Sequence, residues 1–282
     1  MIAVVDYQKG NLKSVERGLI AAGGEALITA DASEIARADA IVLPGVGAFA
    51  DAAATMCELG QMEAIRDRVR AGVPFLGICL GEHLMFEHGV EGAPEGNPAC
   101  GLGLLPGTVV AMPRCDAQGK AFKVPHVGWN TIEIPACSGG AAIPPRGEGG
   151  GNAVLSSGGA GGGAARSSAA KRGLFEHGAF PGSAPQVGSE LAFPDSTPQP
   201  GSNLAFACPL FDGIAPGEYF YFTHSYIAPT GSHTIAETAH SVRFTSAVQF
   251  GECAFGVQFH PEKSSDAGAR ELANFVAIAA RG

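Results

Sequence analysis

The sequence predicts an α/β fold in which a mixed, mostly parallel sheet carries helices on both faces. In the first part of the chain, short apolar runs alternate with segments of helical periodicity, and the connections between them are short. Such alternation is typical of parallel strands that crossover helices bury on both sides. The second part is richer in strands. With 282 residues, 46% of them hydrophobic, the chain can build a sizeable core.

The elements of the first part follow from their local patterns. An apolar run that ends in a carboxylate indicates a buried strand at residues 2–6, and apolar side chains at helical spacing indicate a helix at residues 11–22. Further buried strands are expected at residues 26–28, 40–43 and 73–78. Further helices are expected at residues 49–58, 61–71 and 80–87.

Strands dominate the second part, and a helix is expected at its end. The strands are expected at residues 108–111, 130–134, 219–223, 241–250 and 254–259, and the helix at residues 266–280. Residues 136–205 are rich in Gly, Ala, Ser and Pro, with too little apolar area to offset the entropy of ordering them. We therefore predict a single domain, residues 1–282, with a disordered insertion at 136–205. Composition favours a low-complexity expansion over a lid or a partner-docking segment.

Charge and cysteine usage disfavour several classes of function. The formal net charge is −9 and no basic tract occurs, which argues against nucleic acid or an anionic membrane as the main partner. No apolar run is long enough to span a bilayer, and no signal peptide is visible. The seven cysteines show no CxxC and no ligand-like spacing, so we expect a reducing, cytoplasmic location and neither a metal nor another cofactor.

One cysteine lies where a nucleophile would be placed. Gly77-Ile78-Cys79-Leu80-Gly81 follows a predicted strand and precedes a predicted helix, which is the pattern of a nucleophile elbow. The small flanking residues let the chain bend and let a substrate approach, and the N-terminus of the helix favours a thiolate. A buried cysteine at a glycine-rich strand end is the structural alternative.

A histidine and a glutamate far downstream complete a possible triad. His260 and Glu262 follow another predicted strand, and Pro261 between them stops that strand. A thiolate nucleophile needs a base to take its proton, and the base needs a third group to orient it. We therefore predict Cys79 as the nucleophile, His260 as the base and Glu262 as the orienting carboxylate. The three together disfavour a purely structural role for Cys79.

Acyl transfer through this triad would also need donors for a tetrahedral oxyanion. One donor is expected to be the backbone N–H of Leu80, the residue after the nucleophile. The second is expected from the loop Gly45-Val46-Gly47, which follows a neighbouring predicted strand and whose glycines let a backbone amide turn towards the site. An ordinary tight turn explains this loop equally well.

Several motifs, in order, resemble the triad-type (class I) glutamine amidotransferases, and within that group the glutaminase subunits of imidazole glycerol phosphate synthase. Besides the elbow, the stretches that carry the resemblance are residues 5–12 (VDYQKGNL), 44–49 (PGVGAF), 101–107 (GLGLLPG), 125–130 (PHVGWN), 221–226 (YFTHSY) and 256–264 (GVQFHPEKS). The resemblance covers the whole chain except the insertion.

The resemblance implies a flavodoxin-like fold and a defined activity. The chain would hydrolyse glutamine to glutamate and ammonia through a thioester on Cys79. It would form a heterodimer with a (β/α)8-barrel cyclase subunit, and ammonia would pass through the barrel to form imidazole glycerol phosphate for histidine biosynthesis. Glutaminase activity would stay weak until the partner is occupied. The substrate phosphates would lie on that partner, which agrees with an acidic chain that has no phosphate loop.

The resemblance also implies roles for individual residues. The residues that would line the glutamine site are Gly81, His83, His224, Ser225 and Tyr226. The residues that would lie near the partner interface are Asn11, Trp129, Asn130 and Lys263. For Trp129, a core aromatic is almost as good an interpretation. The Gly45-Val46-Gly47 loop would rearrange.

The sequence departs from the family pattern at three places. The elbow continues as Gly81-Glu82-His83, where the family usually has Gly-Met-Gln and uses that glutamine to hold the substrate. Gln8 stands at a usual glycine. The insertion is the third departure, and it could alter docking.

Three alternatives to an active ammonia-donating subunit remain at this stage. The Glu82-His83 pair suggests a regulatory or scaffolding subunit with impaired glutaminase activity, although the intact triad argues against it. Another triad-type amidotransferase, such as the aminase component of anthranilate synthase, is disfavoured by residues 125–130 and by Asp6-Tyr7. A free-standing γ-glutamyl hydrolase would not need a partner.

Overall fold

The computed structural model of the protein describes residues 1–135, 206 and 208–281. The predicted insertion at residues 136–205 lies outside these described residues.

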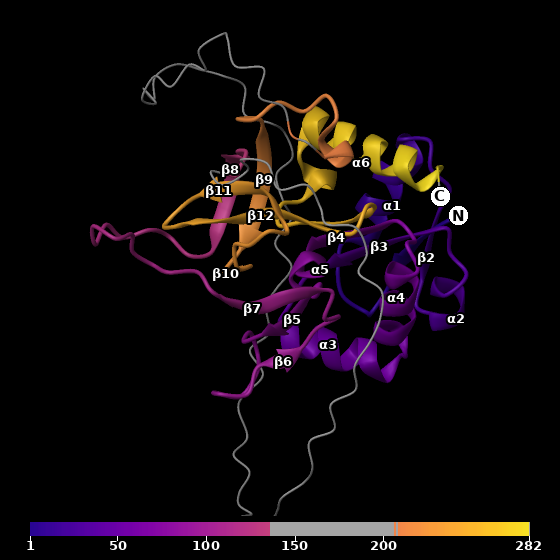
Figure 1. Ribbon diagram of the computed structural model, residues 1–282, viewed down its shortest axis with the longest axis horizontal. Helices are drawn as coiled ribbons and strands as arrows, with labels where there is room; N and C mark the ends of the chain where they lie inside the picture. Colours follow the sequence, from indigo (N-terminus) through magenta and orange to yellow (C-terminus); the bar gives the residue numbers. More distant parts are fainter. Residues whose placement is uncertain (136–205, 207, 282) are drawn as a thin grey trace, which may run out of the picture. The chain divides into compact units, whose positions relative to one another are not determined.

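A seven-stranded sheet forms the centre of the fold, in the order β11-β12-β13-β4-β3-β1-β2 (Figure 1). Five strands run parallel: β1 (Ile2–Val5), β2 (Ala26–Thr29), β3 (Ala40–Gly45), β4 (Phe75–Cys79) and β13 (Ala254–Val257). Two antiparallel strands extend one side: β11 (Thr234–Ala239) and β12 (Arg243–Phe250). The parallel order β2-β1-β3-β4-β13 is that of flavodoxin-like folds, so the predicted fold class is confirmed.

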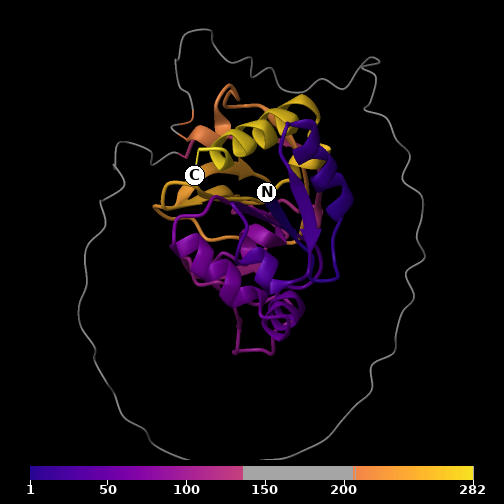
Figure 2. The ribbon, with the colours of Figure 1, turned by 90° about the vertical axis from the view of Figure 1, so that its right-hand side faces the viewer.

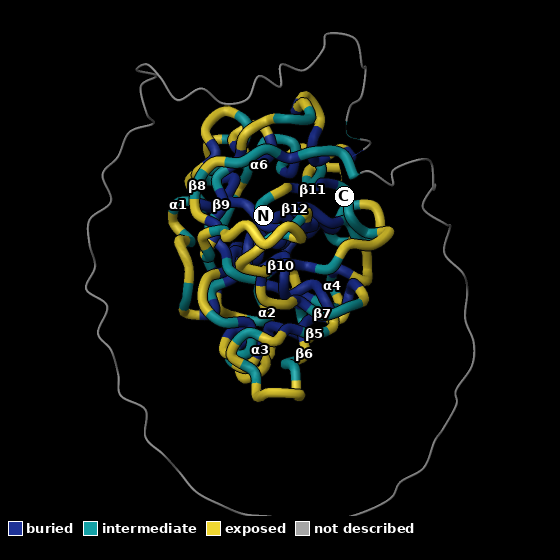
Figure 3. Tube along the Cα trace, turned by 90° about the vertical axis from the view of Figure 1, so that its left-hand side faces the viewer, coloured by how far each residue is buried: buried dark blue, intermediate teal, exposed yellow. Residues whose placement is uncertain are grey.

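Helices cover both faces of this sheet because the strand side chains alternate between two apolar cores. Ile2 and Val4 belong to the core that includes α1 (Leu12–Ala21) and α6 (Ser265–Ala279). Ala3 and Val5 belong to the core beneath the three helices α2 (Ala32–Ile35), α3 (Phe49–Glu58) and α4 (Gln61–Arg70). Figures 1 and 2 show α6 above the sheet and α3 and α4 below it. The central strands are buried throughout (Figure 3).

Two smaller sheets are built from the second part of the chain. One has the order β10-β7-β5-β6, made of β5 (Phe86–Gly89), β6 (Ala99–Cys100), β7 (Leu105–Ala111) and β10 (Tyr226–Ile227). The other is an antiparallel ribbon of β8 (His126–Thr131) and β9 (Tyr219–His224). The remaining elements are short: α5 (Leu80–His83) and the 3-10 turns η1 (Pro209–Phe211) and η2 (Pro261–Lys263).

Most predicted elements of the main sheet and its helices are confirmed to within two residues, but two expectations are wrong. The helix expected at residues 80–87 ends at His83, because Phe86 and His88 pair with β7 in the second sheet. The strand expected at 130–134 instead spans His126–Thr131, where it pairs with β9. Both errors concern pairing with distant segments, which local periodicity does not contain.

Among the described helices, none is long and apolar enough to cross a membrane.

The turn after β4 is packed so closely that glycine is required on both sides of Cys79. A Cβ on Gly81 would overlap the carbonyl oxygen of Leu43 on β3, and a Cβ on Gly77 would collide with the backbone of Gly81. Backbone atoms cannot move away as the end of a flexible side chain can. The two glycines therefore let α5 begin directly against β3.

We expect Gly81→Ala to lower the free energy of unfolding by about 3 kcal/mol or more, because the added methyl group overpacks against backbone. Gly23→Ala is the matched control: Gly23 has a φ of +89° with open space around it, so only conformational strain of about 1 kcal/mol is expected. Urea denaturation followed by circular dichroism measures both. Equal effects of the two substitutions would contradict close packing at Gly81.

Candidate active site

The candidate site lies at the carboxyl ends of three adjacent parallel strands. β3 ends at Gly45, β4 ends at Cys79, and β13 ends two residues before Phe259. In the sheet register, Gly45 is paired with Cys79, and Val257 with Ile78. The segments that leave these strands therefore start side by side. In open α/β sheets this edge is where ligands bind.

Cys79 occupies the turn between β4 and α5 in a conformation that non-glycine residues rarely adopt. Its φ is 56° and its ψ is −108°. The side chain is buried, with its Sγ atom 3.9 Å from the carbonyl oxygen of Thr223 and 3.8 Å from Nε2 of Gln258. A strained backbone of this kind is typical of residues held for function.

His260 and Glu262 form a buried pair next to Cys79. Nδ1 of His260 lies 2.9 Å from Oε1 of Glu262, and the backbone N–H of His260 donates to the carbonyl of Tyr221 at 2.9 Å. Burial lowers the pKa of His260, but interactions with Cys79 and Glu262 outweigh it and raise the pKa to about 9. Nε2 is buried, and no described atom meets hydrogen-bond geometry with it. No other described group therefore competes with Cys79 for this nitrogen.

The loop expected to bind the oxyanion lies beside the nucleophile, but one of its amides is already engaged. The backbone N–H of Val46 donates to the hydroxyl oxygen of Tyr7 at 3.1 Å. Tyr7 is buried, and burial raises its pKa. Leu80 is the first residue of α5, where backbone N–H groups have no partner within the helix. The described loop therefore offers Val46 to the site only after its bond to Tyr7 is released.

Glu82 and His83, the unusual pair after the elbow, are both buried. Neither carboxylate oxygen of Glu82 has a hydrogen-bond partner among the described residues, and burial, with a contribution from Cys79, raises its pKa well above the ordinary value. Burial therefore favours the neutral carboxylic acid form of Glu82. Burial also lowers the pKa of His83 to about 4, and its Nε2 lies 2.7 Å from Oε1 of Gln258. Burial thus favours the uncharged form of both side chains.

The segment His224-Ser225-Tyr226, predicted to line the glutamine site, continues from Thr223 beside the thiol. Nδ1 of His224 lies 2.8 Å from the carbonyl of Tyr226, and its Nε2 lies 3.0 Å from Nδ1 of His126. Burial lowers the pKa of His224 well below its ordinary value, so the ring is neutral and Nδ1 is the donor to the carbonyl. This network fixes the segment against the ribbon of β8 and β9.

The four candidate interface residues divide into two groups. Asn11 and Lys263 are exposed and line a small cleft beside His260 and Glu262. Trp129 is 43% exposed on the β8–β9 ribbon and packs edge-on against Tyr221. Asn130 is half-buried instead, and its side-chain amide donates to the carbonyl of Ala239 at 2.9 Å.

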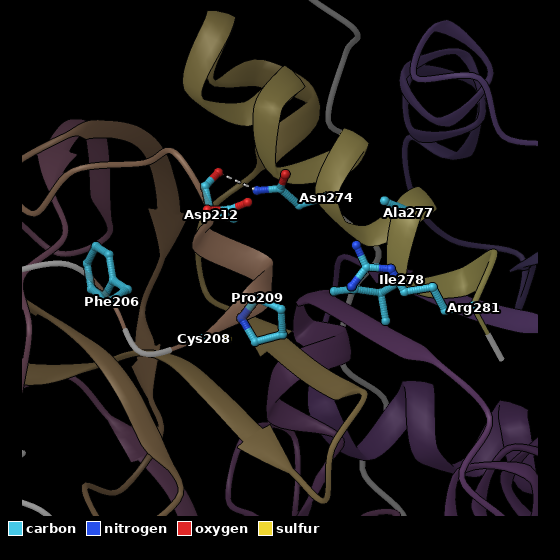
Figure 4. A pocket seen from close by; sticks show the side chains of 8 residues that line it. All are labelled: Phe206, Cys208, Pro209, Asp212, Asn274, Ala277, Ile278 and Arg281. Carbon is cyan, nitrogen blue, oxygen red and sulfur yellow. Dashed lines mark hydrogen bonds between the residues drawn. The ribbon is translucent and has the colours of Figure 1, made fainter.

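Little open space lies beside the three residues of the predicted triad. The cleft beside His260 has a volume of about 20 Å³. A larger cavity of about 340 Å³ lies elsewhere, between the η1 segment and α6 (Figure 4). It contains none of the predicted site residues; its lining consists of Phe206, Cys208, Pro209, Asp212, Asn274, Ala277, Ile278 and Arg281. Within the described residues, no cluster of three or more His, Cys, Asp or Glu side chains could hold a metal ion.

Sequence reasoning missed Gln258 and Tyr7 as neighbours of the site. Gln258 lies two residues before His260, inside a stretch quoted only for its resemblance. Tyr7 directly follows the carboxylate that ends the first apolar run. The sequence position of both residues was informative. Each is a polar residue just past the end of a buried parallel strand, which is the edge of the sheet where such sites form.

Comparison with known proteins places this chain in a family. The family model "Glutamine amidotransferase class-I" matches residues 3–134. Imidazole glycerol phosphate synthase subunit HisH of Moorella thermoacetica is 34% identical over 276 residues, which cover 97% of this chain and 93% of that protein. The protein of the same name from Rhodopirellula baltica is 33% identical and covers 98% of this chain and 96% of its own length. A crystal structure of a glutamine amidotransferase has a TM-score of 0.56 at 15% identity, covering 99% and 100% of the two chains.

We expect Glu82→Gln to stabilise the protein increasingly as pH rises. The folded-state pKa of Glu82 is raised above the unfolded value, so its contribution to stability is complete below the unfolded pKa and is lost as pH rises through the folded pKa. The neutral amide has no such loss, and each pKa unit of difference corresponds to about 1.4 kcal/mol. Urea denaturation at pH 5 and pH 8 measures the change.

Glu63→Gln on the exposed face of α4 is the matched control for the same loss of one carboxylate. Its effect should be nearly the same at both pH values. A Glu82→Gln effect that is likewise independent of pH would show that Glu82 ionises normally in the folded protein.

Proposed function

Because the chain belongs to the class-I glutamine amidotransferases, in the family of imidazole glycerol phosphate synthase subunit HisH, we propose that it hydrolyses glutamine to glutamate and ammonia at Cys79. In this proposal His260 is the general base and Glu262 orients it. One observation supports the assignment most directly. The buried thiol of Cys79, on a strained backbone, lies next to His260, whose Nδ1 is hydrogen-bonded to the buried carboxylate of Glu262. This is the arrangement that thiol acyl transfer requires.

The proposed reaction has two steps. The Cys79 thiol gives its proton to Nε2 of His260, and Sγ bonds to the carboxamide carbon of glutamine. The C–N bond then breaks, the leaving ammonia takes the proton from His260, and a thioester remains. In the second step His260 removes a proton from water, which attacks the thioester carbon. Glutamate leaves and the proton returns to the sulfur.

The Glu262 carboxylate supports both steps by accepting from Nδ1, which keeps Nε2 available for the thiol and stabilises the imidazolium. The proposed oxyanion donors are the backbone N–H of Leu80 and one amide of the Gly45-Val46-Gly47 loop. Since the Val46 N–H is bonded to Tyr7, its use would require that this bond break. A resting site with only one free donor would hydrolyse glutamine slowly, which is consistent with the weak unstimulated activity implied by the resemblance.

We also propose that the chain acts as one subunit of an imidazole glycerol phosphate synthase and docks on a (β/α)8-barrel cyclase in a heterodimer. The relatives are named as subunits of that synthase. Exposed apolar side chains support a docking surface that includes Trp129 and Val127 on the β8–β9 ribbon. Lys263 lies over the Tyr221 ring at 6.0 Å, which places a cation next to that surface. Ammonia released at Cys79 would pass to the partner.

A cytoplasmic location is part of the proposal. The cysteines in the described part of the chain are all free thiols, which suits a reducing compartment. Localisation of a tagged chain by cell fractionation tests it.

The experiment that tests the proposed function is glutamate release by the purified chain, alone and mixed with the barrel cyclase and its ribonucleotide ligand. Strong stimulation by the liganded partner is the expected result. No glutamate release in either condition, with a stable complex still forming, would support the alternative of a catalytically impaired scaffolding subunit.

We expect Cys79→Ala to abolish glutamine-dependent synthesis by the complex while synthesis from added ammonium continues. Alanine removes the only atom able to form the thioester but leaves the partner's chemistry intact. Cys57→Ala, on the exposed face of α3, is the matched control and should leave both activities unchanged. Loss of both activities in Cys79→Ala would refute the role assigned to the thiol.

We expect Tyr7→Phe to raise the glutamate release of the free chain several-fold. The substitution removes the acceptor of the Val46 N–H, and a neutral hydrogen bond contributes about 1 kcal/mol. The partner-stimulated rate should change less, so the ratio of stimulated to unstimulated rates should fall. Tyr219→Phe, at an exposed hydroxyl, is the control for the free chain. An unchanged unstimulated rate in a folded Tyr7→Phe protein would rule out this restraint on the loop.

A further inference from the structure

A second hydrogen-bond chain, made of His83 and Gln258, reaches the nucleophile. Nε2 of His83 lies 2.7 Å from Oε1 of Gln258, and Nε2 of Gln258 lies 3.8 Å from Sγ of Cys79. All three side chains are buried: Gln258 is 0%, His83 3% and Cys79 8% exposed. Water therefore does not compete for these bonds, and their direction is set by the groups themselves.

The fold brings these three residues together for simple reasons. Gln258 is the first residue past β13, whose Val257 is paired with Ile78 of β4, so Gln258 and Cys79 follow neighbouring strand ends. The backbone N–H of Gln258 donates to the carbonyl of Ser246 at 3.0 Å, which fixes the residue. His83 lies at the end of α5, four residues after Cys79, and so returns to the same side of the turn.

The protonation state of His83 sets the donor and the acceptor in each of these hydrogen bonds. Burial lowers the pKa of His83 to about 4, so the ring is neutral and carries one N–H. An amide oxygen can only accept, so the proton must be on Nε2 of His83. That bond fixes the amide of Gln258 with its oxygen away from the sulfur and its NH2 group towards it. The reverse orientation would place a carbonyl dipole against a developing thiolate.

We propose that Gln258 is a further catalytic residue, which donates a hydrogen bond to the sulfur of Cys79, and that His83 is the positioning residue that orients its amide. The proposal rests on the function of Cys79 proposed above. The thiol hydrogen can point to the carbonyl of Thr223, at 3.9 Å, while the sulfur is protonated. Once the proton has moved to His260, the N–H of Gln258 remains to stabilise the thiolate. Histidine at position 83 thus keeps a donor where the family usually has glutamine.

The test is the rate of alkylation of Cys79 by iodoacetamide as a function of pH, in the full chain, read by mass spectrometry of the peptide that contains Cys79. Gln258→Met keeps the volume and removes the donor. We expect the midpoint of its profile to move up by about one pH unit, which is about a tenfold lower rate below the midpoint. His83→Leu should give a similar shift, because a free amide can rotate away from the sulfur.

Two further variants separate orientation from packing. His83→Gln retains a donor towards Gln258 and should keep the midpoint close to that of the unchanged protein. The double variant His83→Leu with Gln258→Met should shift it no further than Gln258→Met alone, since both act through one bond. Gln249→Met, whose side chain bonds only to surface carbonyls at Gly251 and Glu252, is the matched control.

The results of the alkylation test can be distinguished from those of the glutamate-release test, because alkylation needs neither glutamine nor a partner. Unshifted midpoints in folded Gln258→Met and His83→Leu would overturn the inference even in an active glutaminase. Additive shifts in the double variant would also overturn it, since the two residues would then act independently. A shift that His83→Gln prevents would support it even if the chain released no glutamate. If Gln258→Met fails to fold, the comparison of His83→Leu with His83→Gln decides the question alone.

Discussion

The turn after β4 lies against β3 without any side chain between them, and the rest of the site depends on this contact. Gly77 and Gly81 have no room for a Cβ, and a Cβ on Gly45, at the end of β3, would meet the hydroxyl of Tyr7. The close approach forces Cys79 into a left-handed conformation and starts α5 at Leu80. One steric constraint thus sets the direction of the thiol, the position of the Leu80 amide and the distance to the oxyanion loop.

In the described chain, the residues with strained backbone conformations lie around the turn after β4. Outside glycine, positive φ values occur among the described residues at Gln8, Cys79 and Ser265. Gln8 follows Tyr7, the partner of the Val46 amide, and Ser265 follows the turn that carries Glu262. Such conformations persist only where surrounding packing over-determines them. Here the two apolar cores on either side of the sheet provide that packing, and the strained residues all lie at its carboxyl edge.

Local patterns were sufficient for the parallel sheet and for the pairing of His260 with Glu262, but not for the contacts that link them. Alternating apolar runs predicted β1, β3 and β4, and the spacing of His260 and Glu262 after a strand predicted their pairing with each other. The helix expected beyond His83 was wrong because Phe86 pairs with Leu105, a long-range choice that local propensity does not contain. Gln258 was missed for the same reason. Only the sheet topology shows that the end of β13 lies beside the end of β4, and therefore that Gln258 lies beside Cys79.

Burial favours the uncharged forms of the ionisable side chains packed most closely around the proposed triad. It raises the pKa of Glu82 and lowers the pKa values of His83 and His224. In a medium of low dielectric constant, an additional anion would oppose the thiolate and an additional cation would compete with His260 for it. An acidic and a basic residue can therefore follow the elbow with little effect on its electrostatics, because burial favours the uncharged form of each. The hydrogen bond from His83 to Gln258 orients the amide of Gln258, so that its N–H dipole points at the sulfur of Cys79.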